Sequence, residues 1–172
     1  MVQCDKNRDA MATKPIGEIV QTVLSVAKSA QRITLGFSDA IKLLSNTPEE
    51  AQFCFLAEPK FGDSATHMNE VLLQAFCYEH GIYIIKVDSG RKLAHVLGTL
   101  NADETCVLIR KSATDHDNND DVDNEHNDMD GNEDDATTTT AASSQSEEDI
   151  LVNFCENTWH NADYCIVKLP EL

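Results

Sequence analysis

Apolar positions along the chain follow two kinds of pattern. Stretches with apolar residues every three or four positions are typical of amphipathic helices, and short continuous apolar runs are typical of buried strands. The first pattern predicts helices over residues 13–32, 37–46, 66–80, 89–98 and 146–159. The second predicts strands over residues 32–36, 51–57, 82–87, 105–110 and 164–169. This alternation predicts an α/β domain whose helices cover a central sheet.

Residues that favour helix ends support several of these boundaries. Ser38 is a candidate N-cap of the second helix, and Ser146 with Asp149 resembles a capping box at the start of the last one. Gly81 and Gly98 stand where a C-cap glycine is expected, directly after helical stretches.

The negative charge is concentrated in one part of the chain. The formal net charge is -17, yet residues 115–149 hold 14 of the 30 acidic residues and no Lys or Arg. Such a composition cannot bury enough apolar surface to offset its ordering entropy. We therefore expect a flexible N-terminus at 1–12, one domain formed by 13–111 and 147–172, and a disordered acidic loop at 112–146. The acidic balance disfavours nucleic-acid binding, which relies on Lys and Arg.

The acidic run does not match a calcium-binding EF-hand loop. Counted from Asp117, the sixth position is Val122 instead of Gly and the twelfth is Asp128 instead of Glu. The six cysteines form no Cys-x-x-Cys pair and mostly lie in apolar runs, which predicts buried free thiols and no zinc site. We expect no metal, no cofactor and no enzymatic activity. The N-terminus lacks an apolar run, so we expect a soluble, intracellular protein without a signal peptide.

The helix predicted at residues 66–80 is apolar on more than one side. Met68, Leu72 and Phe76 mark one stripe, while Val71 and its helical neighbours mark another. A helix that packs only on a sheet needs a single apolar stripe. Two interpretations therefore stand level: a tightly buried central helix, or a helix shared between the sheet and another subunit.

Several strings in collinear order resemble the growth arrest and DNA-damage-inducible stress-protein family. They are "ITLGFSDAIKLLS", "QAFCYEHGIYIIKV", "GRKLAHVLG", "CVLI", "NFCENTW" and "IVKLPEL". The resemblance covers residues 16–172 apart from the acidic run. It implies a three-layer α/β/α sandwich with a mixed central sheet, a fold shared with kink-turn RNA-binding ribosomal proteins.

The resemblance also implies a function, which we take as an expectation. Family members are non-catalytic stress regulators of the nucleus and cytoplasm. They activate a MAP kinase kinase kinase, raise p38 and JNK signalling, contact cell-cycle regulators and self-associate. Their self-association maps to the helix matching residues 66–80 and the helix before it. The expected interface residues are therefore Leu72, Leu73, Phe76, Ile41 and Leu44.

Two departures from the family concern acidic residues. The dense acidic loop of the family, after its second strand, is reduced here to Glu58 and Asp63, so kinase contacts ascribed to that loop are in doubt. Residues of the acidic run, namely Asp120, Asp121 and Asp123, are candidates to supply the missing charge from another position.

An RNA-binding module of the kink-turn type is the alternative function. The fold's RNA-binding branch reads RNA through a Gly-x-Asn-Glu-x-x-Lys string. Here Ser38 and Asp39 replace the Asn–Glu pair, and Lys42 remains without a basic surround.

Overall fold

The computed structural model describes residues 14–58, 64–99, 104–112, 146–158 and 166–171. Helices and strands follow one another in the order α1 (Ile16–Ser29), β1 (Ile33–Leu35), α2 (Phe37–Asn46), η1 (Pro48–Glu50), β2 (Ala51–Ala57), α3 (Ser64–Glu79), β3 (Tyr83–Val87), α4 (Gly90–Leu97), β4 (Cys106–Arg110), α5 (Glu147–Thr158) and β5 (Ile166–Val167). All ten predicted elements are therefore present. The short 3-10 turn η1, which the apolar pattern did not predict, is added before β2.

The described strands form one mixed sheet in the order β1-β4-β2-β3-β5. β1 and β2 both pair antiparallel with β4, whereas β3 pairs parallel with β2 and with β5. The β2–β4 register shifts between Ala51 and Phe53, so the pairing is irregular at Gln52. β5 is shorter than the predicted 164–169 because only Ile166 and Val167 pair with β3.

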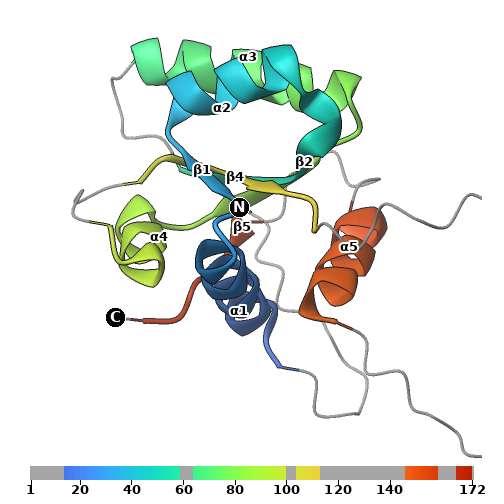
Figure 1. The fold of residues 1–172 in the computed structure, drawn as a ribbon. Helices are drawn as coiled ribbons and strands as arrows, with labels where there is room; N and C mark the ends of the chain where they lie inside the picture. Colours follow the sequence, from blue (N-terminus) through green and yellow to red (C-terminus); the bar gives the residue numbers. More distant parts are fainter. Residues whose placement is uncertain (1–13, 59–63, 100–103, 113–145, 159–165, 172) are drawn as a thin grey trace, which may run out of the picture.

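Helices cover both faces of the sheet and complete the predicted three-layer sandwich. Figure 1 shows α2 and α3 on one face and α1, α4 and α5 on the other. We call the buried cluster beneath α2 and α3 the upper core, and the cluster beneath α1, α4 and α5 the lower core. Leu44, Cys54 and Leu73 belong to the upper core, and Phe53 and Phe55 to the lower one. Successive residues of β2 thus point to opposite faces and fill both cores.

Two sets of contacts hold the C-terminal segment against α1 and α4. A Cβ atom on Gly17 would lie 2.1 Å from the backbone oxygen of Lys168, so α1 packs against the residue that follows β5 only with glycine here. Lys92 of α4 donates hydrogen bonds to Asp88, Glu171 and the backbone oxygen of Leu169. These contacts hold the C-terminal segment against the domain.

The helix ends confirm most of the predicted caps. The Asp149 amide donates to Ser146 Oγ at 3.2 Å and the Ser146 amide donates to Asp149 Oδ2 at 3.1 Å, as a capping box requires. Gly81 and Gly98 have φ of 66° and 56°, values suited to glycine. The prediction for Ser38 is wrong: Gly36, with φ 82°, turns the chain directly into α2, so the helix begins before Ser38.

The predictions for the N-terminus and the acidic loop lie largely outside the described residues. Residues 1–12 are not described, and of 112–146 only Ser112 and Ser146 are. These two residues mark where the acidic segment leaves and rejoins the domain.

Candidate partner-binding surfaces

One side of α3 carries a stripe of exposed apolar side chains. Met68, Val71, Leu72 and Tyr78 are 69%, 50%, 47% and 48% exposed. We call these four residues the α3 surface. Exposed apolar residues that gather on one face mark an interaction site more often than isolated ones do. The fully buried alternative for this helix is therefore wrong.

The five expected interface residues divide into surface and core. Leu72 belongs to the α3 surface, and Phe76 and Ile41 are half-buried beside the upper core. Leu73 and Leu44 are 0% and 1% exposed, so neither is available to a partner. Leu73 shares with Cys77 the side of α3 that faces the sheet, whereas Leu72 lies about 100° further around the helix.

Three residues of the α3 surface were not among the expected interface residues. Met68, Val71 and Tyr78 were visible as apolar positions in the sequence, but their orientation was ambiguous because α3 is apolar on several sides. Glu70 makes the buried side of α3 hard to recognise in the sequence, because this charged residue lies on the side that faces the sheet. It is held there by Lys86 Nζ at 3.0 Å and Gln74 Nε2 at 2.9 Å.

The upper core beneath the α3 surface contains three free thiols, those of Cys54, Cys77 and Cys106. Contact with the thiols of Cys106 and Cys77, together with burial, raises the pKa of Cys54 well above its usual range. In the lower core, burial and the nearby Glu156 raise the pKa of Cys155 to about 12. Protonated buried thiols are poor nucleophiles and pack as small apolar groups. The prediction of buried free thiols is confirmed for these four cysteines; Cys4 and Cys165 lie outside the described residues.

The acidic residues expected to contact a partner are mostly outside the described ranges. Glu58 is exposed directly after β2, and its amide donates to the backbone oxygen of Val87. Asp63, Asp120, Asp121 and Asp123 are not described. Of these five acids, the described residues therefore include only Glu58.

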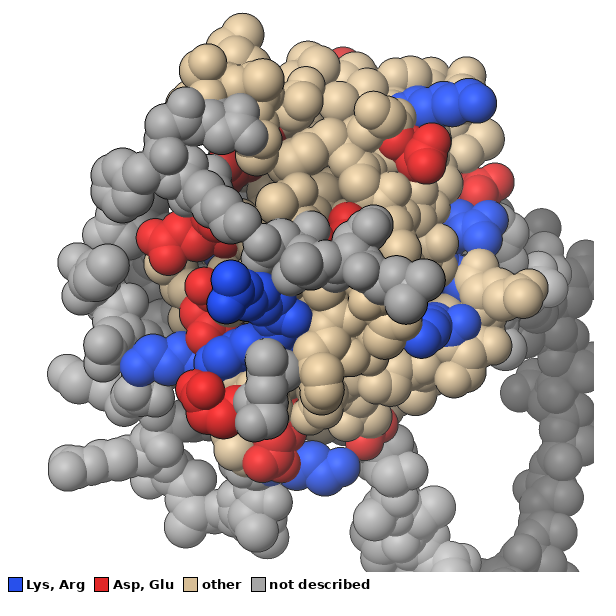
Figure 2. Space-filling model, turned by 90° about the vertical axis from the view of Figure 1, so that its left-hand side faces the viewer, with Lys and Arg blue, Asp and Glu red and all other residues tan. Residues whose placement is uncertain are grey.

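The edge of the sheet where β2 and β3 end also holds the residues of the RNA-type string. Ser38, Asp39 and Lys42 are exposed on α2, which begins at this edge. Figure 2 looks onto this side and shows Lys and Arg interspersed with Asp and Glu among the described residues. A phosphate backbone needs a surface where positive charge dominates. The described part of this edge does not favour the RNA-binding alternative.

The described residues contain neither a metal-binding cluster nor a membrane-spanning helix. Among them, no group of three His, Cys, Asp or Glu side chains is arranged to hold a metal ion. No helix within the described ranges is long and apolar enough to cross a membrane.

The layers and surfaces described above define a three-layer α/β/α protein whose exposed apolar residues gather mainly on one helix. The chain belongs to the Ribosomal protein L7Ae/L30e/S12e/Gadd45 family, whose model matches residues 18–118. This match confirms the family and the fold that the resemblance implied.

Curated relatives place the similarity on the stress-protein side of this family. The chain is 30% identical over 125 residues to growth arrest and DNA damage-inducible protein GADD45 beta of Bos taurus, which covers 67% of this chain and 77% of that protein. It is 38% identical over 84 residues to GADD45 alpha of Homo sapiens, covering 48% of this chain and 51% of that protein. The chain thus spans about half the length of this second relative. Such relatives are non-enzymatic regulators named for growth arrest and DNA damage.

A solved structure was also matched. The Giardia lamblia 15.5kD RNA binding protein is 16% identical, with a TM-score of 0.48, and the match covers 60% of this chain and 81% of that one. A likeness at this level does not bear on function.

Proposed function

We propose that this chain is a non-catalytic stress-response regulator that binds and activates a MAP kinase kinase kinase. Its activity would raise p38 and JNK signalling and contribute to growth arrest, the DNA-damage response and apoptosis. The observation that carries this proposal is family membership together with similarity to the growth arrest and DNA damage-inducible proteins. The protein acts in the nucleus and cytoplasm, also contacts cell-cycle regulators, and functions as a homodimer through the α3 surface.

Activation follows from differential binding to two states of the kinase. A regulator that binds the open kinase more tightly than the autoinhibited one shifts the population toward the open state. A tenfold preference contributes about 1.4 kcal/mol to this shift. The regulator needs no catalytic residue for this mechanism, only a surface that the open kinase recognises.

The test uses the full-length regulator with a MAP kinase kinase kinase. We expect the recombinant chain to retain the kinase's N-terminal regulatory region in a pull-down, and its expression in cells to raise p38 and JNK phosphorylation. A kinase lacking that region serves as the control and should be neither retained nor further activated. Absence of both retention and increased phosphorylation would refute the proposal.

A further inference from the structure

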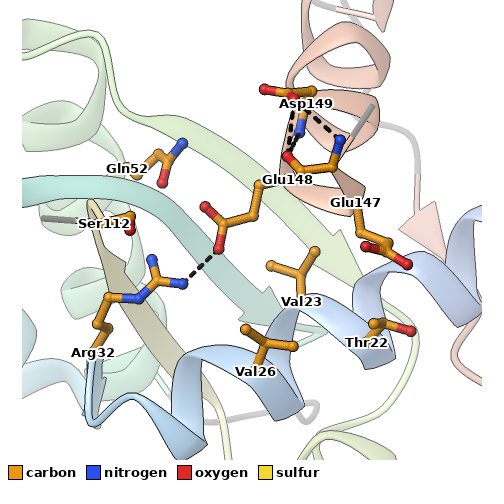
Figure 3. Close-up of a pocket in the computed structure, with 10 residues that line it drawn as sticks. Thr22, Val23, Val26, Arg32, Gln52, Ser112, Glu147, Glu148 and Asp149 are labelled. Atoms are coloured by element: carbon orange, nitrogen blue, oxygen red, sulfur yellow. Dashed lines mark hydrogen bonds and ion pairs between the residues drawn. The ribbon is translucent and has the colours of Figure 1, made fainter. Parts of the chain in front are cut away.

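A solvent-open groove lies on the side of the sheet opposite α3, where α1, the start of α5 and the residues after β4 meet. Figure 3 shows its lining side chains. The groove has a volume of about 300 Å³, and Ser112 and Ser146 both line it. It therefore lies where residues 113–145 leave and rejoin the domain, and it shares no residue with the α3 surface.

One wall of the groove is apolar and comes from α1. Val23 is buried, but Val26 is 52% exposed. Within the described part of the chain, every other large apolar side chain of comparable exposure belongs to the α3 surface. Val26 thus offers an apolar contact that the domain itself leaves uncovered.

The facing wall is polar and contains an unsatisfied hydrogen-bond acceptor. Arg32 Nη2 donates to Glu148 Oε1 at 2.5 Å, which fixes this ion pair across the groove (Figure 3). Gln52 lies beside it at the irregular point of the β2–β4 pairing. Its side-chain oxygen is buried and has no hydrogen-bond partner in the structure. A buried unpaired acceptor destabilises a protein by about 1–3 kcal/mol, so a donor supplied by a ligand would be favourable here.

The charge around the groove favours a cationic ligand. Glu147, Glu148 and Asp149 form part of the lining, where Arg32 is paired with Glu148, and Lys14 is paired with Glu147. Residues 113–145, which are covalently joined to both ends of the groove, carry eleven acidic residues and no Lys or Arg. Uncompensated charge of one sign attracts a partner of the opposite sign over distances of about a Debye length.

We propose that this groove is a docking site for a basic segment of a partner protein. An Arg or Lys side chain would enter the groove and lie close to the carboxylates of α5. A rotation of the partly buried Gln52 side chain would then turn its Oε1 toward the ligand and let it accept a hydrogen bond. The aliphatic part of the same side chain would pack on Val26, as long cationic side chains commonly do on apolar surface. Because the groove and the α3 surface lie on opposite faces of the sheet, this docking is compatible with a dimer formed through α3.

Fluorescence anisotropy with a labelled decapeptide of alternating Arg and Ala tests the site on the full chain. We expect saturable one-to-one binding that weakens with added salt. Val26→Lys should weaken binding at least tenfold, because it removes the apolar contact and adds a repelling charge. Gln21→Lys adds the same charge to an exposed position of the same helix outside the lining, and should change the affinity less than twofold.

A second variant separates loss of the site from loss of folding. Gln52→Met keeps a side chain of similar size and removes the unpaired oxygen, so the protein should be at least as thermally stable as the wild type. Peptide binding should nevertheless weaken severalfold, because the acceptor is gone. Equal weakening by Val26→Lys and Gln21→Lys would overturn the proposal, as would equal affinity for a peptide with Gln in place of Arg.

Discussion

At the scale of single residues, Glu104 carries a carboxyl group that is buried just before β4. It is 6% exposed, and its amide donates to the backbone oxygen of Gly90, which fixes it against the beginning of α4. Removal from water raises the pKa of this carboxyl, because burial disfavours the charged form. The folded protein therefore holds this proton more tightly than the unfolded chain does.

Glu104→Gln should reduce the loss of stability that accompanies a rise in pH above about 4.5, the ordinary pKa of a glutamate. Between that value and the raised pKa of the folded state, the folded protein binds more protons, so its free energy of unfolding falls as pH increases. Urea denaturation from pH 4.5 to 8 should show Glu104→Gln gaining relative stability with pH. Glu49→Gln makes the same change on an exposed side chain. Parallel curves for Glu104→Gln and the wild type would contradict this account.

Helix caps could be predicted from the sequence where they depend only on residues close together along the chain. The capping box of Ser146 and Asp149 follows from residue types three positions apart, and the structure confirms it. The assignment of Ser38 failed because the glycine before α2 adopts a positive φ and donates its amide to the backbone oxygen of Cys106. That contact joins residues seventy positions apart, which no local pattern contains.

At the scale of an element, α3 shows why the buried side of a helix cannot be predicted from apolar spacing when several sides of the helix are apolar. Its sheet-facing side includes Leu73 and Cys77 but also the buried Glu70, whose charge is offset by Lys86 on β3. A buried ion pair makes a polar position part of the interior, so the polar residue no longer indicates the solvent side. All three leucines were expected at an interface, yet only Leu72 is exposed, because residue type alone does not distinguish it from the buried Leu73 and Leu44.

Leu72→Glu should convert a dimer formed through the α3 surface into a monomer. A carboxylate placed in an apolar interface loses hydration without gaining a partner, so we expect the dissociation constant to rise at least tenfold, about 1.4 kcal/mol. Sedimentation velocity at micromolar concentration measures this change. Since Leu72 is 47% exposed, the stability of the monomer should change little.

Gln21→Glu is the matched control for this experiment, because it adds the same charge to an exposed position on α1. It should sediment as the wild type does. If the wild type is itself monomeric at micromolar concentration, dimerisation through α3 is ruled out for this chain.

At the scale of the whole molecule, the number and order of the described α-helices and strands could be predicted from apolar spacing, although the 3-10 turn η1 could not. The order of strands in the sheet could not be predicted in this way. β4 pairs with both β1 and β2, which lie far from it in the sequence. The three-layer arrangement came from the resemblance to a family, not from periodicity. The groove at Gln52 was not predictable either, since it arises where α1, β2 and α5 converge.

Replacing residues 113–145 with a ten-residue Gly/Ser linker tests the role of the acidic segment. Both attachment points, Ser112 and Ser146, line one groove, and a threefold shorter loop changes the closure free energy by only about 1 kcal/mol. We therefore expect the domain to remain folded, with a weaker and less salt-dependent affinity for the kinase in the pull-down described above. Unchanged affinity and salt dependence would show that the segment is only a tether.

The division of the interior into two cores has a consequence for the order of folding during synthesis. The upper core uses buried residues from Ala40 to Leu108, whereas the lower core uses residues from Ile19 to Leu169. A ribosome that has released β4 has therefore supplied everything the upper core needs. The lower core is incomplete until β5 and the residues after it are made, and the backbone of Lys168 among them packs against Gly17 near the beginning of the chain. Until then, part of the inner side of α1 stays uncovered, and chaperones can bind it on the nascent protein.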